Sequence, residues 1–148
     1  MTVMADAASE TTTIAASFDR LYEIATDFER YPEWAHDVKE AIVRSRDSDG
    51  RATEVEFRAS ALGRSTHYVL GYDYANAPGV LRWQLVKGDI MRALDGAYTF
   101  SSSSTPNATD VRYDVSIDLV VPIPGFVKRR AEVRILSTLK ELKARAEA

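Results

Sequence analysis

The chain has 148 residues, a net charge of −3 and no cysteine. This length suits one domain. The missing cysteine excludes disulfides, thiolate metal sites and a thiol nucleophile, and the acidic balance gives no field that would attract nucleic acid. His36 and His67 are the only histidines, so we expect neither a metal nor a cofactor.

The N-terminal residues lack the basic flank and apolar stretch of a signal peptide. No apolar run approaches the roughly 20 residues that span a bilayer. We therefore expect a cytoplasmic protein with no transmembrane segment, forming a single domain over residues 1–148 in which residues 1–8 are a disordered tail.

The first predicted elements are a strand and two short helices. Glu10–Ile14 is β-branched and predicts a strand. Ser17 is a suitable helix N-cap, and apolar residues at helical spacing follow it as far as Phe28. Pro32 lacks an N–H and disfavours helical geometry at the residue before it, so a second short helix is expected over residues 32–36.

From Val38 onward, apolar and polar residues alternate with period two. Alternation of this kind predicts antiparallel strands with one buried and one solvated face. The loop at Ser101–Asn107 is rich in serine and predicts a surface hairpin turn. The predicted strands cover residues 38–46, 53–61, 65–74, 80–87, 90–100 and 111–119.

The sheet ends at Pro122–Gly125, and a long helix is expected from about Phe126 to the end of the chain. An antiparallel sheet of six or seven strands must cover its apolar face, and this helix is the long cover available. A right-handed twist could curl the sheet around the helix and leave a cavity between them. The predicted fold class is therefore α+β.

Several motifs carry a resemblance to a known family. The segment Asp27–Trp34, followed by Val38 and Lys39, resembles a signature of the polyketide cyclase/dehydrase and lipid-transport family, part of the START-like or SRPBCC superfamily. Further matches fall at residues 81–85, 96–100, 124–132 and 139–143. The resemblance implies the helix-grip fold over nearly the whole chain and a deep pocket for apolar or aromatic ligands such as lipids, isoprenoids or polyketides.

Residues that share the inward side of the predicted strands and helix are candidates for a ligand pocket. Each of them could equally pack an ordinary core, although a buried tyrosine hydroxyl needs a partner that a ligand can supply. The candidates are Phe57, Ala59, Tyr68, Leu70, Tyr72, Trp83, Leu85, Tyr98, Tyr113, Val115, Ile117, Ala131, Ile135 and Thr138.

Other polar residues are weaker candidates. Strand alternation places His67 opposite Tyr68, and His36 is interpreted as a capping or surface residue. Arg92 shares the side of Tyr98, so it either enters the pocket or is exposed near the hairpin, whereas Asp95 falls on the other face. The basic run Lys128–Arg130 is interpreted as a solvated helix face, with contact to an anionic surface as the alternative.

Three functions remain open. We favour a non-catalytic binder or carrier of a small hydrophobic ligand, because no acid–base pair converges in the pattern. An aromatase/cyclase-like enzyme would need at least two of His67, Arg92, Tyr98 and Tyr113 to meet at one point. A protein–protein module has the support only of Val133 and Leu136, which lie off the helix stripe, and of the basic start of the same helix. The oligomeric state is left open.

Overall fold

The computed structural model describes residues 6–61, 64–120 and 125–148, and in residues 125–135 it describes the backbone alone. Seven strands form one antiparallel sheet in the order β1-β7-β6-β5-β4-β3-β2. All pairs except β1–β7 join neighbours in sequence, as hairpins do. The strands are β1 (Asp6–Ile14), β2 (Val38–Arg46), β3 (Ala52–Ala61), β4 (Arg64–Asp73), β5 (Val80–Gly88), β6 (Met91–Ser102) and β7 (Thr109–Leu119).

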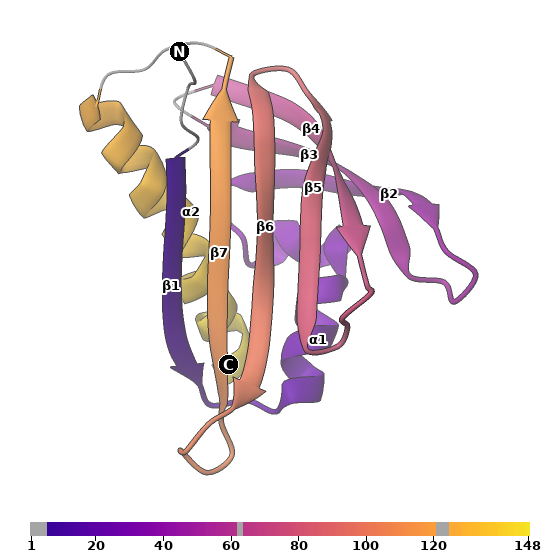
Figure 1. Cartoon of the computed structure of the whole chain (residues 1–148), viewed down its shortest axis with the longest axis vertical. Helices are drawn as coiled ribbons and strands as arrows, with labels where there is room; N and C mark the ends of the chain where they lie inside the picture. Colours follow the sequence, from indigo (N-terminus) through magenta and orange to yellow (C-terminus); the bar gives the residue numbers. More distant parts are fainter. Residues whose placement is uncertain (1–5, 62–63, 121–124) are drawn as a thin grey trace.

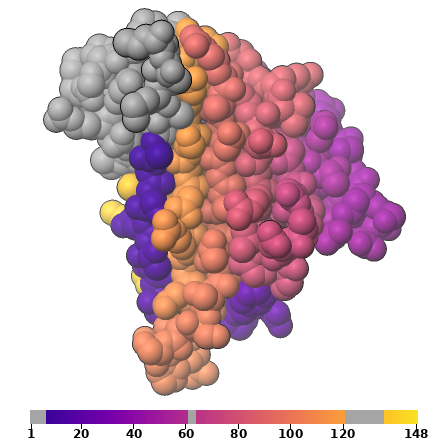
Figure 2. All heavy atoms as spheres, in the orientation of Figure 1, coloured from indigo at the N-terminus to yellow at the C-terminus, as the bar shows by residue number. Residues whose placement is uncertain are grey.

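The sheet bends around the C-terminal helix α2 (Gly125–Glu147), which lies behind it in Figure 1. Two short elements, α1 (Phe18–Thr26) and the 3-10 helix η1 (Phe28–Glu33), close the lower end of the same side. The inner face of the sheet therefore packs against helices, and the outer face, seen in Figure 2, is open to solvent. This arrangement is the predicted α+β helix grip.

Polar contacts fix the C-terminal end of α2. The Arg20 guanidinium donates to the Ala146 carbonyl at 2.9 Å, and the Arg145 guanidinium bonds Glu33 at 2.7 Å. On the β1 side, the Lys143 ammonium donates to the Thr13 carbonyl at 2.8 Å. Burial of Leu139 and Leu142 beneath these contacts ties this half of the helix to α1, η1 and β1.

Two predicted boundaries are wrong. β1 begins at Asp6, so residues 6–8, which were expected in the tail, pair with β7. The chain leaves α-helical geometry at Asp27, whose ψ is 73°, and Pro32 then lies inside η1 rather than at the start of a second helix. The 3-10 turn accommodates Pro32 because it needs few internal hydrogen bonds over so short a length.

None of the helices within the described ranges is long and apolar enough to cross a membrane.

Candidate functional site

The inner face of the sheet carries a continuous band of aromatic rings. Ring centroids lie 4.2 Å apart for Phe28 and Tyr72, 5.4 Å for Trp83 and Tyr98, and 4.9 Å for Tyr98 and Tyr113. The second and third spacings lie within the range of attractive aromatic pairs, and the first pair is packed more closely still. The band runs from η1 across β4, β5, β6 and β7, so it crosses the concave side of the sheet.

Gly96 allows this band to be continuous. A Cβ atom at this position would lie 2.5 Å from Trp83 Cζ2 and 2.5 Å from the Asp114 carbonyl oxygen. Any side chain would therefore displace the Trp83 ring or the β7 backbone. The glycine on β6 sets the depth at which the indole lies.

The tyrosine hydroxyls of the interior divide into two groups. Tyr31 donates to the Ala25 carbonyl, and the Tyr113 and Thr138 hydroxyls are hydrogen-bonded to each other. Within the described part of the chain, no hydrogen bond is found for the hydroxyls of Tyr68, Tyr72 and Tyr98. No side-chain oxygen or nitrogen of the described residues is both fully enclosed and without a partner, so these three hydroxyls do not carry the cost of an orphaned group and can donate to a bound molecule.

Burial raises the pKa of all five interior tyrosines. For Tyr31, Tyr72 and Tyr98 the main cause is desolvation, and the neighbouring tyrosines add to it. Burial also raises the pKa of Tyr68 and of Tyr113, and for Tyr113 the hydrogen bond with Thr138 acts in the opposite direction. These phenols therefore stay protonated at neutral pH and can donate hydrogen bonds.

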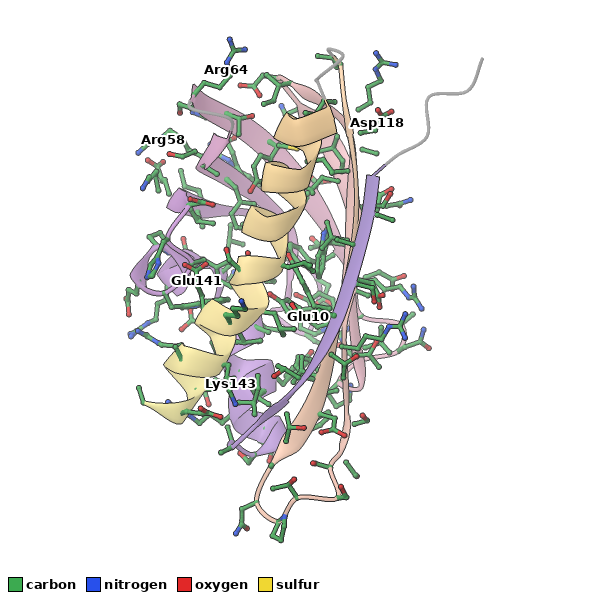
Figure 3. The ribbon with its side chains drawn as sticks, turned by 90° about the vertical axis from the view of Figure 1, so that its left-hand side faces the viewer. Glu10, Arg58, Arg64, Asp118, Glu141 and Lys143 are labelled. Carbon is green, nitrogen blue, oxygen red and sulfur yellow. The ribbon has the colours of Figure 1, made fainter. Side chains whose placement is uncertain are left out.

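One carboxylate borders the aromatic band. Glu141 lies one turn beyond Thr138 on α2, and its charge raises the pKa of both Tyr98 and Tyr113. His36 Nδ1 approaches Glu141 Oε2 to 2.6 Å, and the His36 backbone N–H donates to the same oxygen at 3.2 Å. Figure 3 shows Glu141 on the flank of α2 that faces η1. This contact links the segment that follows η1 to helix α2.

Most of the predicted inward set lies on the inner side. Tyr68, Leu85, Ile117 and Thr138 are half-buried there, whereas Ala131 and Ile135 lie outside the residues whose side chains are described. Leu136, predicted off the helix stripe, packs against the core, and the side chain of Val133 is also outside the description. The buried members of the set are Phe57, Ala59, Leu70, Tyr72, Trp83, Tyr98, Tyr113 and Val115.

The weaker polar candidates do not enter the interior. His67 is exposed, as its alternation indicated. Arg92 is exposed as well, and its guanidinium donates to the Val120 carbonyl at 3.1 Å, because a register shift between Met91 and Ala93 turns it outward. The Asp95 carboxylate accepts from the Leu85 backbone N–H at 3.1 Å. His36 is a surface residue, as predicted, but it contacts α2.

A shallow hollow of about 810 Å³ lies on the outer face, away from the tyrosines (Figure 2). Small residues, among them Gly71 and Ala97, form part of its lining. Its polar groups already have partners in part, since Asp114 accepts from Ser9 at 2.7 Å and from Arg112 at 3.0 Å. The hollow is open to solvent and its lining is about equally polar and apolar, whereas sites for small apolar molecules are enclosed and mostly apolar.

Sequence reasoning missed several residues of the inner band. Phe28, Tyr31 and Trp34 belong to the motif that suggested the family, but the sequence analysis did not place them among the pocket candidates. Phe28 and Tyr31 contact the rings of Tyr72 and Phe57. Glu141 could have been found, because it follows Thr138 by three residues and shares its helix face. Within the described ranges, no group of three metal-ligating side chains is present.

Comparisons with known proteins agree with this architecture. The family model described as polyketide cyclase/dehydrase and lipid transport matches residues 14–142. The chain belongs to this family. No curated protein matches the chain.

Solved structures share the fold over almost the full length. A START superfamily protein from Mycobacterium smegmatis is 25% identical, with a TM-score of 0.86 over 95% of this chain and 97% of that one. The Zhui aromatase/cyclase from Streptomyces sp. R1128 is 12% identical, with a TM-score of 0.80 over 97% and 94%. The ginseng major latex-like protein 151 is 10% identical, with a TM-score of 0.72 over 99% and 100%.

Proposed function

We propose that the protein binds a small hydrophobic ligand, such as a lipid, an isoprenoid or a polyketide, between the inner face of the sheet and α2. The observation that carries this proposal is the set of three tyrosine hydroxyls, on Tyr68, Tyr72 and Tyr98, without a partner among the described residues. A ligand with an apolar body and oxygen acceptors would satisfy them, because protonated phenols donate hydrogen bonds.

The lining suits such a ligand. Rings of Phe57, Tyr68, Tyr72 and Trp83 offer broad apolar surfaces, and the tyrosine hydroxyls among them stay protonated at physiological pH. Apolar walls with a small number of placed donors are typical of small-molecule sites. The family's description, which names lipid transport and polyketide chemistry, supports the same class.

Dye binding tests the proposal. The fluorescent probe 1-anilinonaphthalene-8-sulfonate should bind and accept energy from Trp83. Tyr72→Phe and Tyr98→Phe together should weaken binding about tenfold, since each lost hydrogen bond contributes about 0.5–1.5 kcal/mol. Tyr22→Phe, the same change on α1, should leave affinity unaltered. No binding of the probe, or equal loss in both variants, would contradict the proposal.

Native mass spectrometry of the protein purified from its own host supplies an independent test. A co-purifying apolar molecule that disappears in the Tyr72→Phe/Tyr98→Phe variant supports the proposal. A protein that is always empty and takes up no probe opposes it.

A cyclase-like reaction is the second candidate. It is favoured by the adjacency of Tyr98 and Tyr113, whose rings are 4.9 Å apart, with the Glu141 charge acting on both. His67 and Arg92 are exposed, so of the four groups this reaction would require, Tyr98 and Tyr113 are the two that lie in the interior with adjacent rings. Incubation with a linear poly-β-ketone thioester would separate the two functions, because only an enzyme releases water and a cyclised product faster than the spontaneous aldol cyclisation in buffer.

A further inference from the structure

The charged groups that act on the aromatic band are acidic. Beyond burial, which is the main cause, Glu141 on α2 raises the pKa of Tyr98 and Tyr113, and Asp37, in the segment after η1, raises the pKa of Tyr68. Among the described residues, no lysine or arginine acts on the pKa of these three phenols, and no lysine or arginine side chain is buried. Within that part of the chain, a ligand in the band therefore meets negative charge and no basic group that would neutralise an acid.

Glu141 is held in this environment by one of its two oxygens. Its side chain is 16% exposed, whereas the His36 side chain that contacts it is 76% exposed. The His36 ring and the His36 backbone N–H both bind Oε2, at 2.6 Å and 3.2 Å. No described residue donates a hydrogen bond to the other oxygen, Oε1, although a carboxylate accepts through both. The protein thus positions this carboxylate and leaves it able to accept a hydrogen bond from another molecule.

Glu141 belongs to a polar corner of the interior that consists of Tyr98, Tyr113, Thr138 and Glu141. Thr138 precedes Glu141 by three residues on α2, so the two side chains are neighbours on the helix surface. The Thr138 and Tyr113 hydroxyls are hydrogen-bonded, and the rings of Tyr98 and Tyr113 are adjacent. The polar corner therefore combines a carboxylate acceptor with phenol donors beside α2, whereas stacked rings cover the inner side of β3 and β4.

Polar groups of apolar ligands differ in what they offer to the polar corner. A ketone only accepts hydrogen bonds, so it leaves Glu141 without a donor. A carboxylate also only accepts, and it brings a second negative charge close to Glu141 in an interior of low dielectric constant. An ammonium group only donates, so it leaves the Tyr98 hydroxyl without an acceptor. A hydroxyl group both donates and accepts, and it therefore suits Glu141 and Tyr98 at the same time.

We propose that the ligand is an apolar alcohol and that the polar corner binds its hydroxyl group, with Glu141 as the acceptor and Tyr98 as the donor. This inference rests on the proposed function and narrows it, because it favours isoprenoid and other apolar alcohols over fatty acids. Glu141 is then the residue that sets specificity against acids. Its pairing with His36 positions it for this role.

Three ligands with the same farnesyl chain test the proposal: farnesol, farnesoic acid and farnesylamine. Each competes with 1-anilinonaphthalene, an uncharged fluorophore that lacks the sulfonate which the polar corner would repel. At neutral pH the acid and the amine are charged. Farnesol should displace the fluorophore with an affinity at least tenfold higher than that of farnesoic acid, and several-fold higher than that of farnesylamine. This comparison uses the unmodified protein and needs no variant.

Glu141→Gln shows whether the carboxylate is responsible. Farnesoic acid should bind about tenfold more tightly to this variant, because the like charge is gone, and farnesol several-fold more weakly, because its hydrogen bond is no longer charge-assisted. A damaged fold would weaken both ligands alike, so the ratio of the two affinities is the informative quantity. Glu23→Gln removes the same charge from an exposed position on α1 and should leave the ratio unchanged.

The outcomes separate this inference from the proposed function. If the fluorophore does not bind and none of the three ligands does, the proposed function is wrong and the inference fails with it. If the fluorophore is displaced equally well by all three, or best by the acid or the amine, the inference alone is wrong. An unchanged ratio in Glu141→Gln would also overturn it, since specificity would then not depend on this carboxylate.

Discussion

The two ends of the interior are filled in different ways. Near α1 and the end of α2, Ile14, Leu21 and Leu142 are 0% exposed, and hydrocarbon fills the space. In the aromatic band, Tyr72, Trp83 and Tyr113 retain 9%, 7% and 7% exposure and carry polar atoms. The first region resembles the core of any stable domain, whereas the second keeps groups whose hydrogen bonds another molecule could complete.

This difference separates the residues that hold the fold from those we assign to the ligand. Leu139, Leu142 and Ala146 anchor α2 to α1 and β1 through burial. Thr138 and Glu141 lie on the same half of the helix but interact with Tyr113 and Tyr98. One helix therefore serves both regions, and substitutions on it can test the contrast.

The largest effect is expected in the packed region. Leu142→Ala should lower the free energy of unfolding by about 2–5 kcal/mol, because it leaves a cavity in a site that is fully enclosed. Urea denaturation followed by circular dichroism measures it. Lys140→Ala, two residues away and exposed, should change stability by less than about 0.5 kcal/mol. Similar costs for both would contradict the assignment of this region as the anchor.

Gly96→Ala should have the next largest effect, at the centre of the aromatic band. The new methyl group would collide with the Asp114 carbonyl and the Trp83 ring, at a cost of about 1–3 kcal/mol. Trp83 fluorescence should shift as the ring moves. Gly79→Ala is the control, since its Cβ would meet no atom closer than 3.8 Å. An unchanged spectrum would mean that the glycine does not position the indole.

The protein should lose stability at alkaline pH because its interior tyrosines are buried in the protonated form. The pKa of the interior tyrosines is raised in the folded state, so above pH about 10 the unfolded chain loses protons that the folded chain keeps. Stability is then complete below this pH and falls as the pH rises further. Burial raises the pKa of Tyr74 to about 12, so it too should titrate late.

Phenolate absorbance during a pH titration measures this behaviour. Tyr22, which is only partly buried and has a smaller increase in pKa, should ionise first. The interior phenols should ionise together with unfolding. Ionisation of all seven tyrosines near pH 10 in the folded protein would contradict the proposed environment.

The smallest effect on stability should come from the unpartnered hydroxyls. Tyr98→Phe removes an oxygen for which no described residue provides a partner, so the free energy of unfolding should change by less than about 1 kcal/mol or rise slightly. Tyr31→Phe removes a hydroxyl that donates to the Ala25 carbonyl and should cost more. Denaturation of the two variants side by side measures the difference. A larger loss for Tyr98→Phe would mean that this hydroxyl is already satisfied.

Strand alternation was sufficient to predict much of the inner face. Phe57, Tyr72, Trp83 and Tyr113 are buried as the period of two required, because burial of one face imposes that period. The same argument allowed the Arg92 side chain to point into the pocket. That alternative is wrong, because the register shift after Met91 interrupts the alternation and Arg92 is exposed. Irregularities of this kind depend on pairing with β7, which the local sequence does not reveal.

Contacts between elements were beyond sequence reasoning. His36 was correctly placed at the surface, but its pairing with Glu141 joins residues 105 positions apart. The break at Asp27 also has no proline or glycine to mark it. By contrast, the family motif around Tyr31 and Trp34 led to the fold directly, although not to their part in the aromatic band.

The central claim is that an apolar ligand binds against the inner face and not in the outer hollow. Nuclear magnetic resonance of the isotope-labelled protein, titrated with 1-anilinonaphthalene-8-sulfonate, tests it most directly. We predict that the amide signals of Tyr72, Tyr98, Tyr113 and Thr138 shift in a saturable manner. Shifts confined to Ser9, Arg82, Gln84 and Asp114, which line the outer hollow, would contradict the account.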